Sequence, residues 1–504
     1  MPPPARTLLA RASPLVLARI ASAGITFVIP LVLVRVFAPA EYGTYKQLLL
    51  VSQTVYYLLP MGVAQSLYYF VPRASSPRPY LSQALLFLAV AGLAGAGLLA
   101  LGGGLLAGLL HNPALASAAP LLAVYTAALL GAAPLEVAWT ARGRTGIAAA
   151  CYLGSDLIKA LAMTAPALLG LGLEGVLKGL AAFAVLRLLA TWISHWRGKG
   201  PAIERAALRA QLGYALPVGG AVALLVPQQA LHPYLVSAGL DVAAFAVYAV
   251  GTFQAPIFDM LYAPTSEMLM VRLAELERAG KLSEGVAVFR EAVHKLALFF
   301  VPACAFLIAF APEVVSALFT DKYRVAVPVF RVSALGGLLA CLPVDGALRA
   351  RGETRHLLLA SAVKIAATVP LALWGVARFG MMGGVGSWLA AELIGKSTLA
   401  LRLPRALSTP AGRLLPWAGL ARAAAAAAVA TGATLVVRAA VPDVPHAFVR
   451  LFGLGAVFGL AALATLVAVG DVRRPSASWL MWLDRWRAWR LALWTPRADR
   501  RIAR

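Results

Sequence analysis

Long apolar runs separated by short polar connections recur along almost the whole chain. Most runs are about 20 residues or longer, which is enough for a helix to cross the hydrocarbon core of a bilayer. Their apolar residues are continuous rather than alternating and are rich in Leu and Ala, so helices are favoured over the strands of a membrane barrel. The pattern predicts an all-α polytopic membrane protein with about fourteen transmembrane helices, near 13–37, 44–70, 80–110, 115–139, 146–170, 174–196, 210–236, 242–271, 290–311, 325–346, 355–378, 380–400, 414–440 and 446–470.

A twelve-residue pattern occurs twice, after the fourth and after the tenth predicted helix. Pro134–Thr145 and Pro343–Thr354 share a proline, an acidic residue, an alanine, the triplet Ala-Arg-Gly and a threonine at equivalent positions. The similarity continues at the same offset, where Gly175-Val176 matches Gly384-Val385. Six helices separate the copies, an even number, so both units have the same orientation in the membrane. We therefore predict two parallel six-helix pseudo-repeats followed by two additional C-terminal helices.

These units set the expected domain boundaries. Residues 1–200 form an N-terminal lobe, 201–410 a C-terminal lobe, 411–470 the two additional helices and 471–504 a basic tail. Tryptophans at helical spacing predict that the tail is an amphipathic helix lying in the membrane interface, the alternative being a partly disordered basic tail. The residues on this apolar face are Trp479, Trp482, Trp486, Trp489 and Leu493.

Basic residues are concentrated in every second connection between the predicted helices. The connections 111–114, 171–174 and 237–241, in contrast, contain no Lys or Arg. By the positive-inside rule, both termini are expected in the cytoplasm. This orientation signal also accounts for the net charge of +24, which in a soluble protein would suggest nucleic acid. We expect no nucleic-acid partner.

Composition agrees with a membrane protein that is not an enzyme. The chain is 61% hydrophobic and 13% charged, whereas soluble domains carry about a quarter charged residues. It has no Gly-rich phosphate loop, its six histidines lack ligand spacing, and its three cysteines lie far apart in apolar segments. Its connections are short, so there is little room for a catalytic domain. We expect no catalytic residue, cofactor or metal.

Charged residues inside the predicted helices are the candidates for function, because they are costly in hydrocarbon and usually face a bundle interior or a wet cavity. An excess of cations there suits an anionic cargo, and a pyrophosphate group is met best by Lys and Arg. The candidate substrate-binding cations are Arg19, Arg35, Lys159, Lys178, Lys364 and Lys396.

Each cation also has a structural explanation. Lys159 lies three residues from Asp156, and Lys396 four from Glu392, so either pair could be neutral on its own helix. Arg35, at the outer end of the first helix, could cap or anchor instead of binding, and Arg187 could extend to the cytoplasmic water. In contrast, Arg19 and Lys364 have no acidic neighbour within a helical turn and are the cations most readily assigned to a cavity.

Four further residues are candidates for coupling or gating. Asp259 and Glu267 flank Pro264, and a loosened helix that carries carboxylates suits ion coupling; the alternative is that both lie near cytoplasmic water. Gln228 and His232 share a face in a polar stretch interrupted by prolines, where they could line a cavity. His232 is then a possible proton-sensitive group.

The arginines of the duplicated pattern, Arg142 and Arg351, are expected mainly at cytoplasmic helix ends, where a cation complements the helix dipole. The glycine after each permits a tight turn. The acidic residues of the two copies, Glu136 and Asp345, are expected to pair with these arginines or with partners at a cytoplasmic gate. The duplication is therefore mainly a marker of architecture.

Several motifs resemble those of bacterial polysaccharide-biosynthesis flippases of the Wzx type. The resemblance covers about residues 10–470 and includes Ala-Arg-Gly after helices four and ten, Val247–Gly251, and Ala311–Val315 with Lys322-Tyr323. Residues that fit the opening motif are Arg35, Pro39, Glu41, Tyr42, Gly43 and Tyr45. The related lipid II flippases also have fourteen helices and an arginine in the first helix, to which Arg19 or Arg35 could correspond.

The resemblance implies that the chain translocates an undecaprenyl-pyrophosphate-linked oligosaccharide from the cytoplasmic to the periplasmic leaflet of the bacterial inner membrane by alternating access. The product would serve exopolysaccharide, capsule or O-antigen assembly. Implied partners are the lipid-linked oligosaccharide, membrane lipids, and polysaccharide polymerase and chain-length proteins.

The alternatives are a lipid II flippase or a cation-coupled multidrug exporter of the same superfamily. Multidrug exporters usually have twelve helices and acidic cavities, so the cations and the two extra helices disfavour that alternative. A major-facilitator sugar transporter carries its repeated basic signature after helices two and eight, not four and ten. A membrane enzyme or scaffold is the remaining class.

Overall fold

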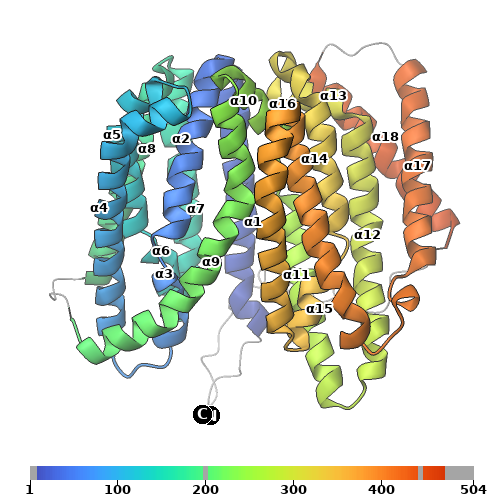
Figure 1. Cartoon of the computed structure of the whole chain (residues 1–504), viewed down its shortest axis with the longest axis horizontal. Coiled ribbons are helices and arrows are strands. Elements are labelled where there is room, and N and C mark those ends of the chain that lie inside the picture. The colour runs from blue at the N-terminus through green and yellow to red at the C-terminus, as the bar shows by residue number, and fades with distance from the viewer. Residues whose placement is uncertain (1–7, 197–201, 441–445, 471–504) are drawn as a thin grey trace, which may run out of the picture.

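The computed structural model describes residues 8–196, 202–440 and 446–470, which form helices and short connections without a strand among them. The all-α class predicted from the sequence is confirmed. The predicted interfacial helix of the tail lies outside the described residues. Figure 1 shows the helices side by side in two bundles, with a further helix pair at one flank.

The first lobe is a bundle in which α4 and α5 pack along each other, α8 packs against α5 and α7, and α1 packs on α7 (Figure 1). Its helices are α1 (Leu8–Val36), α2 (Pro39–Leu58), α3 (Val63–Phe70), α4 (Arg78–Leu109), α5 (Ala114–Gly131), α6 (Pro134–Ala141), α7 (Thr145–Leu168) and α8 (Gly172–Trp196).

We assign the helices after residue 201 to the second lobe, following the boundary expected from the sequence. The first of them, α9, packs on α2, α3 and α4 as well as on α16, and so links the two lobes. The helices of the second lobe are α9 (Arg205–Gly239), α10 (Val242–Gly251), α11 (Ile257–Arg278), α12 (Gly285–Ala309), α13 (Ala311–Phe319), α14 (Val327–Leu339), α15 (Val344–Ala350) and α16 (Thr354–Ala406).

The additional helices α17 (Trp417–Ala440) and α18 (Ala447–Ala468) form a hairpin on the second lobe. The helix α17 packs on α12, and α18 packs on α13. The carboxylate of Glu313, in the first turn of α13, lies 2.7 Å from the Arg438 guanidinium of α17 and 3.8 Å from that of Arg450 in α18. One buried carboxylate thus fixes both added helices to the second lobe.

Among the described residues, eleven helices are long and apolar enough to cross a membrane, and the bent pair α2 and α3 brings the number to twelve. The helix α16 is a hairpin of two rods that turns at Gly380, where φ is +55°. If the two rods of α16 are counted separately and α10 with α11 is counted as one further span, these twelve become the fourteen crossings predicted from the sequence. That total stays a prediction, whereas the multi-pass membrane architecture is clear.

The two copies of the duplicated pattern have the same backbone structure. The short helices α6 and α15 both end at a glycine with positive φ, +75° at Gly143 and +67° at Gly352. In the first copy the amide of Arg144 donates to the carbonyl of Trp139, at 3.0 Å, and in the second Glu353 donates to Leu348, also at 3.0 Å. Both are helix ends closed by a left-handed glycine, which explains why the sequence repeats there.

The lobes are joined at the upper end of the molecule in Figure 1, where α1 contacts α13 and α2 contacts α10. A buried apolar cluster fills this junction with Leu33, Tyr42, Phe319 and Tyr323. A Cβ on Gly43 would lie 2.1 Å from the carbonyl oxygen of Val242, so only glycine permits this approach of α2 and α10. The junction is therefore apolar and closely packed.

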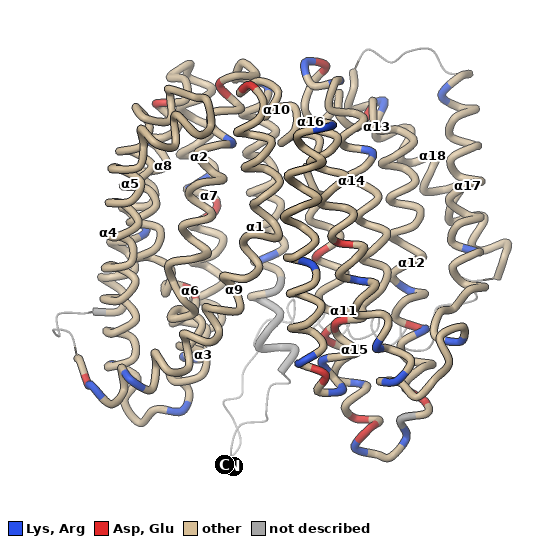
Figure 2. Tube along the Cα trace, in the orientation of Figure 1, with Lys and Arg blue, Asp and Glu red and all other residues tan. Residues whose placement is uncertain are grey.

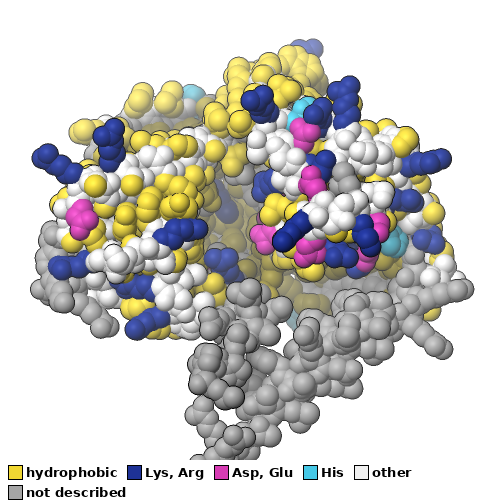
Figure 3. All heavy atoms as spheres, turned by 90° about the horizontal axis from the view of Figure 1, so that it is seen from below, with side chains coloured by type: hydrophobic (Ala, Val, Ile, Leu, Met, Phe, Trp, Pro, Cys, Tyr) yellow, Lys and Arg dark blue, Asp and Glu magenta, His cyan; other side chains and the backbone are white. Residues whose placement is uncertain are grey.

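At the opposite end the lobes separate. Figure 3, seen from below, shows a hollow between them with Lys and Arg side chains inside it. Figure 2 shows that charged residues crowd the lower ends of α11, α15 and α16 and become sparse along the middle of the helices. The molecule is thus closed at one end and open between its lobes at the other.

Candidate functional site

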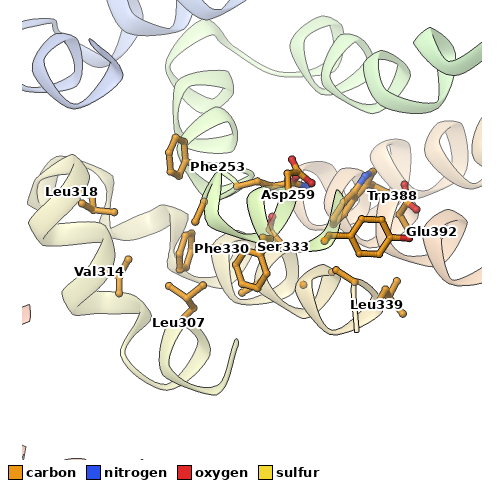
Figure 4. Close-up of a pocket in the computed structure, with 18 of the residues that line it drawn as sticks. Phe253, Asp259, Leu307, Val314, Leu318, Phe330, Ser333, Leu339, Trp388 and Glu392 are labelled. Carbon is orange, nitrogen blue, oxygen red and sulfur yellow. The ribbon is translucent and has the colours of Figure 1, made fainter. Parts of the chain in front are cut away.

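A cavity of about 280 Å³ lies in the second lobe, between α11 to α14 and the second rod of α16. The connection between α10 and α11 and Phe27 of α1 also line it. Figure 4 shows that one part of its wall is apolar. The residues of this part are Phe253, Leu307, Val314, Leu318 and Phe330. The other part carries carboxylates, so the cavity is amphipathic.

The polar part of the wall is built by two helices. Trp388, Glu392 and Lys396 follow one another at intervals of four residues on the second rod of α16, so they share one face. Asp259 and Tyr262 face them from α11, one turn apart. Figure 4 shows Asp259, Trp388 and Glu392 around the same opening.

Lys396 has three polar neighbours. Its ammonium donates to the Tyr262 hydroxyl at 3.0 Å and to the Leu342 carbonyl at 3.1 Å, and it lies 3.8 Å from the carboxylate of Asp345. The Tyr262 hydroxyl in turn donates to Asp345. The acidic residue of the duplicated pattern, Asp345, therefore contacts two residues of the cavity wall but does not line the cavity itself.

Glu392 pairs with Lys364 of the first rod of α16, not with Lys396 on its own rod. The prediction that Lys364 is unpaired is therefore wrong. The two rods pack so closely that a Cβ on Gly395 would lie 3.0 Å from the Lys364 side chain, which directs the ammonium towards the next rod. The four-residue spacing of Glu392 and Lys396 permits an ion pair within one helix. It contains no information on Lys364, which lies closer to Glu392 on the neighbouring rod.

A second group of polar residues lies where α1 packs on α7. The Arg19 guanidinium lies 3.4 Å from the Tyr152 hydroxyl and 5.3 Å from the centre of its ring. The Ser22 hydroxyl donates to Asp156, and Lys159, one turn further along α7, is half-buried. Arg19 itself is exposed, so its charge is available to a ligand.

Of the six candidate cations, only Lys396 lines the cavity itself, and Lys364 contacts its wall through Glu392. Arg35 and Lys178 lie in neither this group nor the group around Arg19. Arg35 donates to the carbonyls of Ala317, at 2.5 Å, and Leu318, at 2.8 Å, which end α13. Lys178 forms an exposed pair with Glu174 at 2.7 Å, one turn away on the same helix. Since Arg35 holds the lobe junction and Lys178 pairs with Glu174 away from the cavity, we leave both out of the proposed binding set. Lys364 is also paired, but its partner Glu392 lines the cavity, so we keep it.

The coupling candidates occupy three different environments. Asp259 lines the cavity, whereas Glu267 is exposed two turns further along α11. Gln228 is buried and donates to the Leu224 carbonyl of its own helix at 3.0 Å. His232 is also buried, and its Nδ1 lies 2.5 Å from the Tyr248 hydroxyl of α10. The described structure brings only Asp259 of the four to the cavity.

One buried ion pair was not predicted from the sequence. Arg187 of α8 lies 2.7 Å from the carboxylate of Glu136, and these side chains are 16% and 4% exposed. The interpretation that Arg187 extends to water is therefore wrong. Of the two alternatives for Glu136, pairing with Arg142 is also wrong, and Arg142 lies 3.2 Å from His195. The two helices are 51 residues apart at this point, and only their packing brings the charges together.

In the second copy of the pattern, Arg351 pairs with Glu277 of α11. Asp345 instead lies 3.7 Å from Arg349 and, as described above, near Lys396. Tyr262 is the functional candidate that sequence reasoning missed. Its position one turn after Asp259, on a helix that carries several polar residues, was the available signal.

The fold is a multi-pass helical bundle with two lobes and a hollow between them. An amphipathic cavity lies beside the hollow. This architecture is typical of membrane transporters. The chain belongs to the family described as polysaccharide biosynthesis protein, whose family model matches residues 32–328. No curated protein matches the chain closely enough to add to this assignment.

Solved structures share the fold. A lipid II flippase, MurJ, in an inward closed conformation is 12% identical with a TM-score of 0.73, and the similarity covers 91% of this chain and 99% of MurJ. A MATE transporter of Vibrio cholerae is 14% identical, with a TM-score of 0.54 and coverage of 80% and 96%.

A MOP superfamily transporter from Pyrococcus furiosus is 12% identical, with a TM-score of 0.55 and coverage of 79% and 94%. At these identities the similarity establishes the fold alone. The cargo has to be inferred from the chemistry of the site.

Proposed function

We propose that this protein is a flippase that moves an undecaprenyl-pyrophosphate-linked oligosaccharide from the cytoplasmic to the periplasmic leaflet of the bacterial inner membrane. The observation that carries the proposal is the amphipathic cavity beside a hollow that contains basic side chains. A lipid-linked sugar is itself amphipathic, with an anionic headgroup and an apolar chain. Because the chain belongs to a polysaccharide biosynthesis family, we infer that the headgroup carries sugars.

The headgroup is bound by cations from both lobes. Arg19 and Lys159 contribute from α1 and α7, and Lys364 and Lys396 from the two rods of α16. Pyrophosphate accepts several charge-assisted hydrogen bonds at once, which favours such a divided set of donors. The polyprenyl chain stays in the bilayer, so the cavity need hold only the headgroup.

Transport proceeds by alternating access. In the described state the lobes are joined at the end where Arg35 contacts α13, and they are separate at the opposite, charge-rich end. With both termini in the cytoplasm, as the distribution of Lys and Arg indicates, the open end faces the cytoplasm. The state is then ready to accept cargo from the inner leaflet.

The fold shared with a lipid II flippase supports a lipid-linked cargo and makes lipid II itself the nearest alternative. A cation-coupled exporter is a second candidate, because Asp259 and Glu392 line the cavity and acidic residues suit cationic drugs. Polysaccharide polymerase and chain-length proteins are the proposed downstream partners in exopolysaccharide, capsule or O-antigen assembly.

Complementation tests the proposal. The chain is expressed in strains that each lack one flippase, for O-antigen, exopolysaccharide or lipid II, and the polymer that returns is measured. We expect one of the polysaccharides to return with wild type and to fall at least tenfold in the triple variant of Arg19→Gln, Lys159→Gln and Lys364→Gln.

Lys178→Gln is the matched control, because it also removes one positive charge but outside the proposed binding set. It should restore polymer as well as wild type does. Rescue of the lipid II strain alone would identify the alternative flippase. Resistance to cationic drugs without rescue of any polymer would overturn the proposal in favour of an exporter.

A further inference from the structure

The offset that relates the two copies of the duplicated pattern also relates two cations outside it. Pro134 and Pro343 are 209 residues apart, and so are Arg187 and Lys396. In each lobe an acidic residue in the first turn of a short helix, Glu136 in α6 or Asp345 in α15, faces the equivalent cation. The pseudo-repeat therefore contains one acid–cation pair in each lobe.

The pair of the first lobe is closed. Glu136 and Arg187 are in direct contact at 2.7 Å, and both are largely buried. Neither lines the cavity of the second lobe. Removing Arg187 from this contact would leave a buried carboxylate without its cation, which is strongly unfavourable. This copy is suited to hold α6 against α8 permanently.

The pair of the second lobe is open. Lys396 lies 3.8 Å from Asp345, and the Tyr262 hydroxyl bonds to both. Asp345 has another cation, Arg349, at 3.7 Å, whereas the equivalent position in the first lobe is Thr140. Asp345 therefore keeps a positive partner and a hydrogen bond if Lys396 moves away. Lys396 also lines the cavity, so an anionic ligand can reach it.

We infer that Lys396 exchanges partners during binding: it leaves Asp345 and Tyr262 and binds the phosphate of the cargo headgroup, whereas its equivalent Arg187 stays paired. Asp345 is then a competitor that holds Lys396 in the empty cavity and excludes weak anions. This inference rests on the proposed function. The ligand chemistry is a phosphate ester or pyrophosphate, attached to a polyprenyl chain.

Two opposite substitutions test the exchange. The full chain is placed in lipid nanodiscs, and the affinity for undecaprenyl pyrophosphate is measured. Lys396→Gln should weaken binding about tenfold or more, because it removes a charge-assisted donor. Asp345→Asn should instead tighten binding severalfold, because it removes the competing carboxylate.

Further variants separate folding from binding. Tyr262→Phe leaves the charges of Lys396 and Asp345 in place and removes one hydrogen-bond partner of Lys396, so it should also tighten binding. Lys396→Arg should retain most of the affinity that Lys396→Gln loses. The double variant Glu136→Gln with Arg187→Gln is the matched control from the other lobe, and it should bind as wild type does. Inorganic pyrophosphate and undecaprenol separate recognition of the phosphate from recognition of the chain.

A purely structural pair predicts a different pattern. If Lys396→Gln and Asp345→Asn both weaken binding, or Lys396→Gln leaves it unchanged, the exchange is wrong although the flippase proposal stands. If the double variant of Glu136 and Arg187 weakens binding of undecaprenyl pyrophosphate as much as Lys396→Gln does, the two lobes do not differ in the way we infer. If wild type binds none of the phosphorylated probes, the proposed function fails and the exchange fails with it.

Discussion

Arg35 lies at the outer end of the first helix, where a charged residue could either bind cargo or hold the protein together. The structure gives it the carbonyls of Ala317 and Leu318 and places its guanidinium 5.2 Å from the centre of the Phe448 ring. Three separate parts of the molecule, α1, α13 and α18, therefore meet at one side chain. Its contacts make it a lock on the closed end.

Arg35→Ala should weaken this lock. Hydrogen bonds to a charged group contribute about 1.5–3 kcal/mol each, so loss of two shifts the equilibrium between closed and open states at this end by about a hundredfold or more, since about 1.4 kcal/mol is a factor of ten. The measurement is labelling of a cysteine placed at Phe319 in a variant without Cys151, Cys304 and Cys341. Labelling should rise at least severalfold, and Arg331→Ala, which removes an exposed arginine of α14, is the control.

The buried pair of Glu136 and Arg187 gives a second prediction. Glu136→Gln or Arg187→Gln alone should destabilise the protein by about 3–5 kcal/mol, because each leaves an uncompensated buried charge. The double variant should lose much less stability than the sum of the single variants. Thermal unfolding in detergent measures all three proteins, and additive losses would show that the two side chains are not coupled.

At the residue scale, the sequence identified which residue types matter but not their partners. It placed Glu392 and Lys396 one turn apart and left Lys364 unpaired, whereas the structure pairs Glu392 with Lys364, 28 residues away. The short-range spacing along one helix is readable from the sequence. Which face meets the neighbouring helix depends on packing, and the same limit hid the partner of Arg187.

At the scale of elements, glycines decide where helices approach each other and where they turn. The two rods of α16 touch at Gly375 and Gly383, where a Cβ on Gly383 would lie 1.7 Å from the Gly375 carbonyl oxygen. The apolar pattern predicted a boundary between 378 and 380, and the turn at Gly380 agrees with it. The break between α2 and α3 was not predicted, although Pro60 and Gly62 mark it in the sequence and Gly62 takes a left-handed conformation there, with φ +74°.

Gly383→Ala should push the rods of α16 apart. Overpacking of this kind costs about 1–3 kcal/mol. Because the second rod carries cavity residues and the first carries Lys364, the partner of Glu392, cargo binding should fall as well. Gly386→Ala is the matched control, since a Cβ there meets nothing within 4 Å. Thermal unfolding in detergent measures the first effect. Equal stability of the two variants would contradict the close contact.

At the scale of the whole molecule, the duplicated pattern carried the most information. It predicted two equivalent units, and the matching turns after α6 and α15 show that each copy builds the same local structure. The hollow between the lobes could not be predicted, because it depends on how far the units are apart and not on how each one folds. The lobe boundary near residue 200 stays a prediction, since α9 contacts both lobes.

The orientation of the whole chain is testable. With both termini in the cytoplasm, a green fluorescent protein fused after residue 470 should be fluorescent, and alkaline phosphatase inserted at the connection 111–114 should be active. Alkaline phosphatase inserted at the basic connection that contains Arg142 should be inactive. The opposite pattern of activities would invert the membrane orientation and turn the open end of the hollow towards the periplasm.

The attachment of α17 and α18 through Glu313 has a practical consequence. Because Arg438 and Arg450 hold the hairpin on α13, these helices should travel with the second lobe as one solid piece. A fluorophore on α17 then reports the position of that lobe. Energy transfer from α17 to α4 should change when the molecule turns over cargo, whereas transfer from α17 to α12 should stay constant. The hairpin of α17 and α18 is thus a suitable labelling site for single-molecule measurements of lobe movement during the transport cycle.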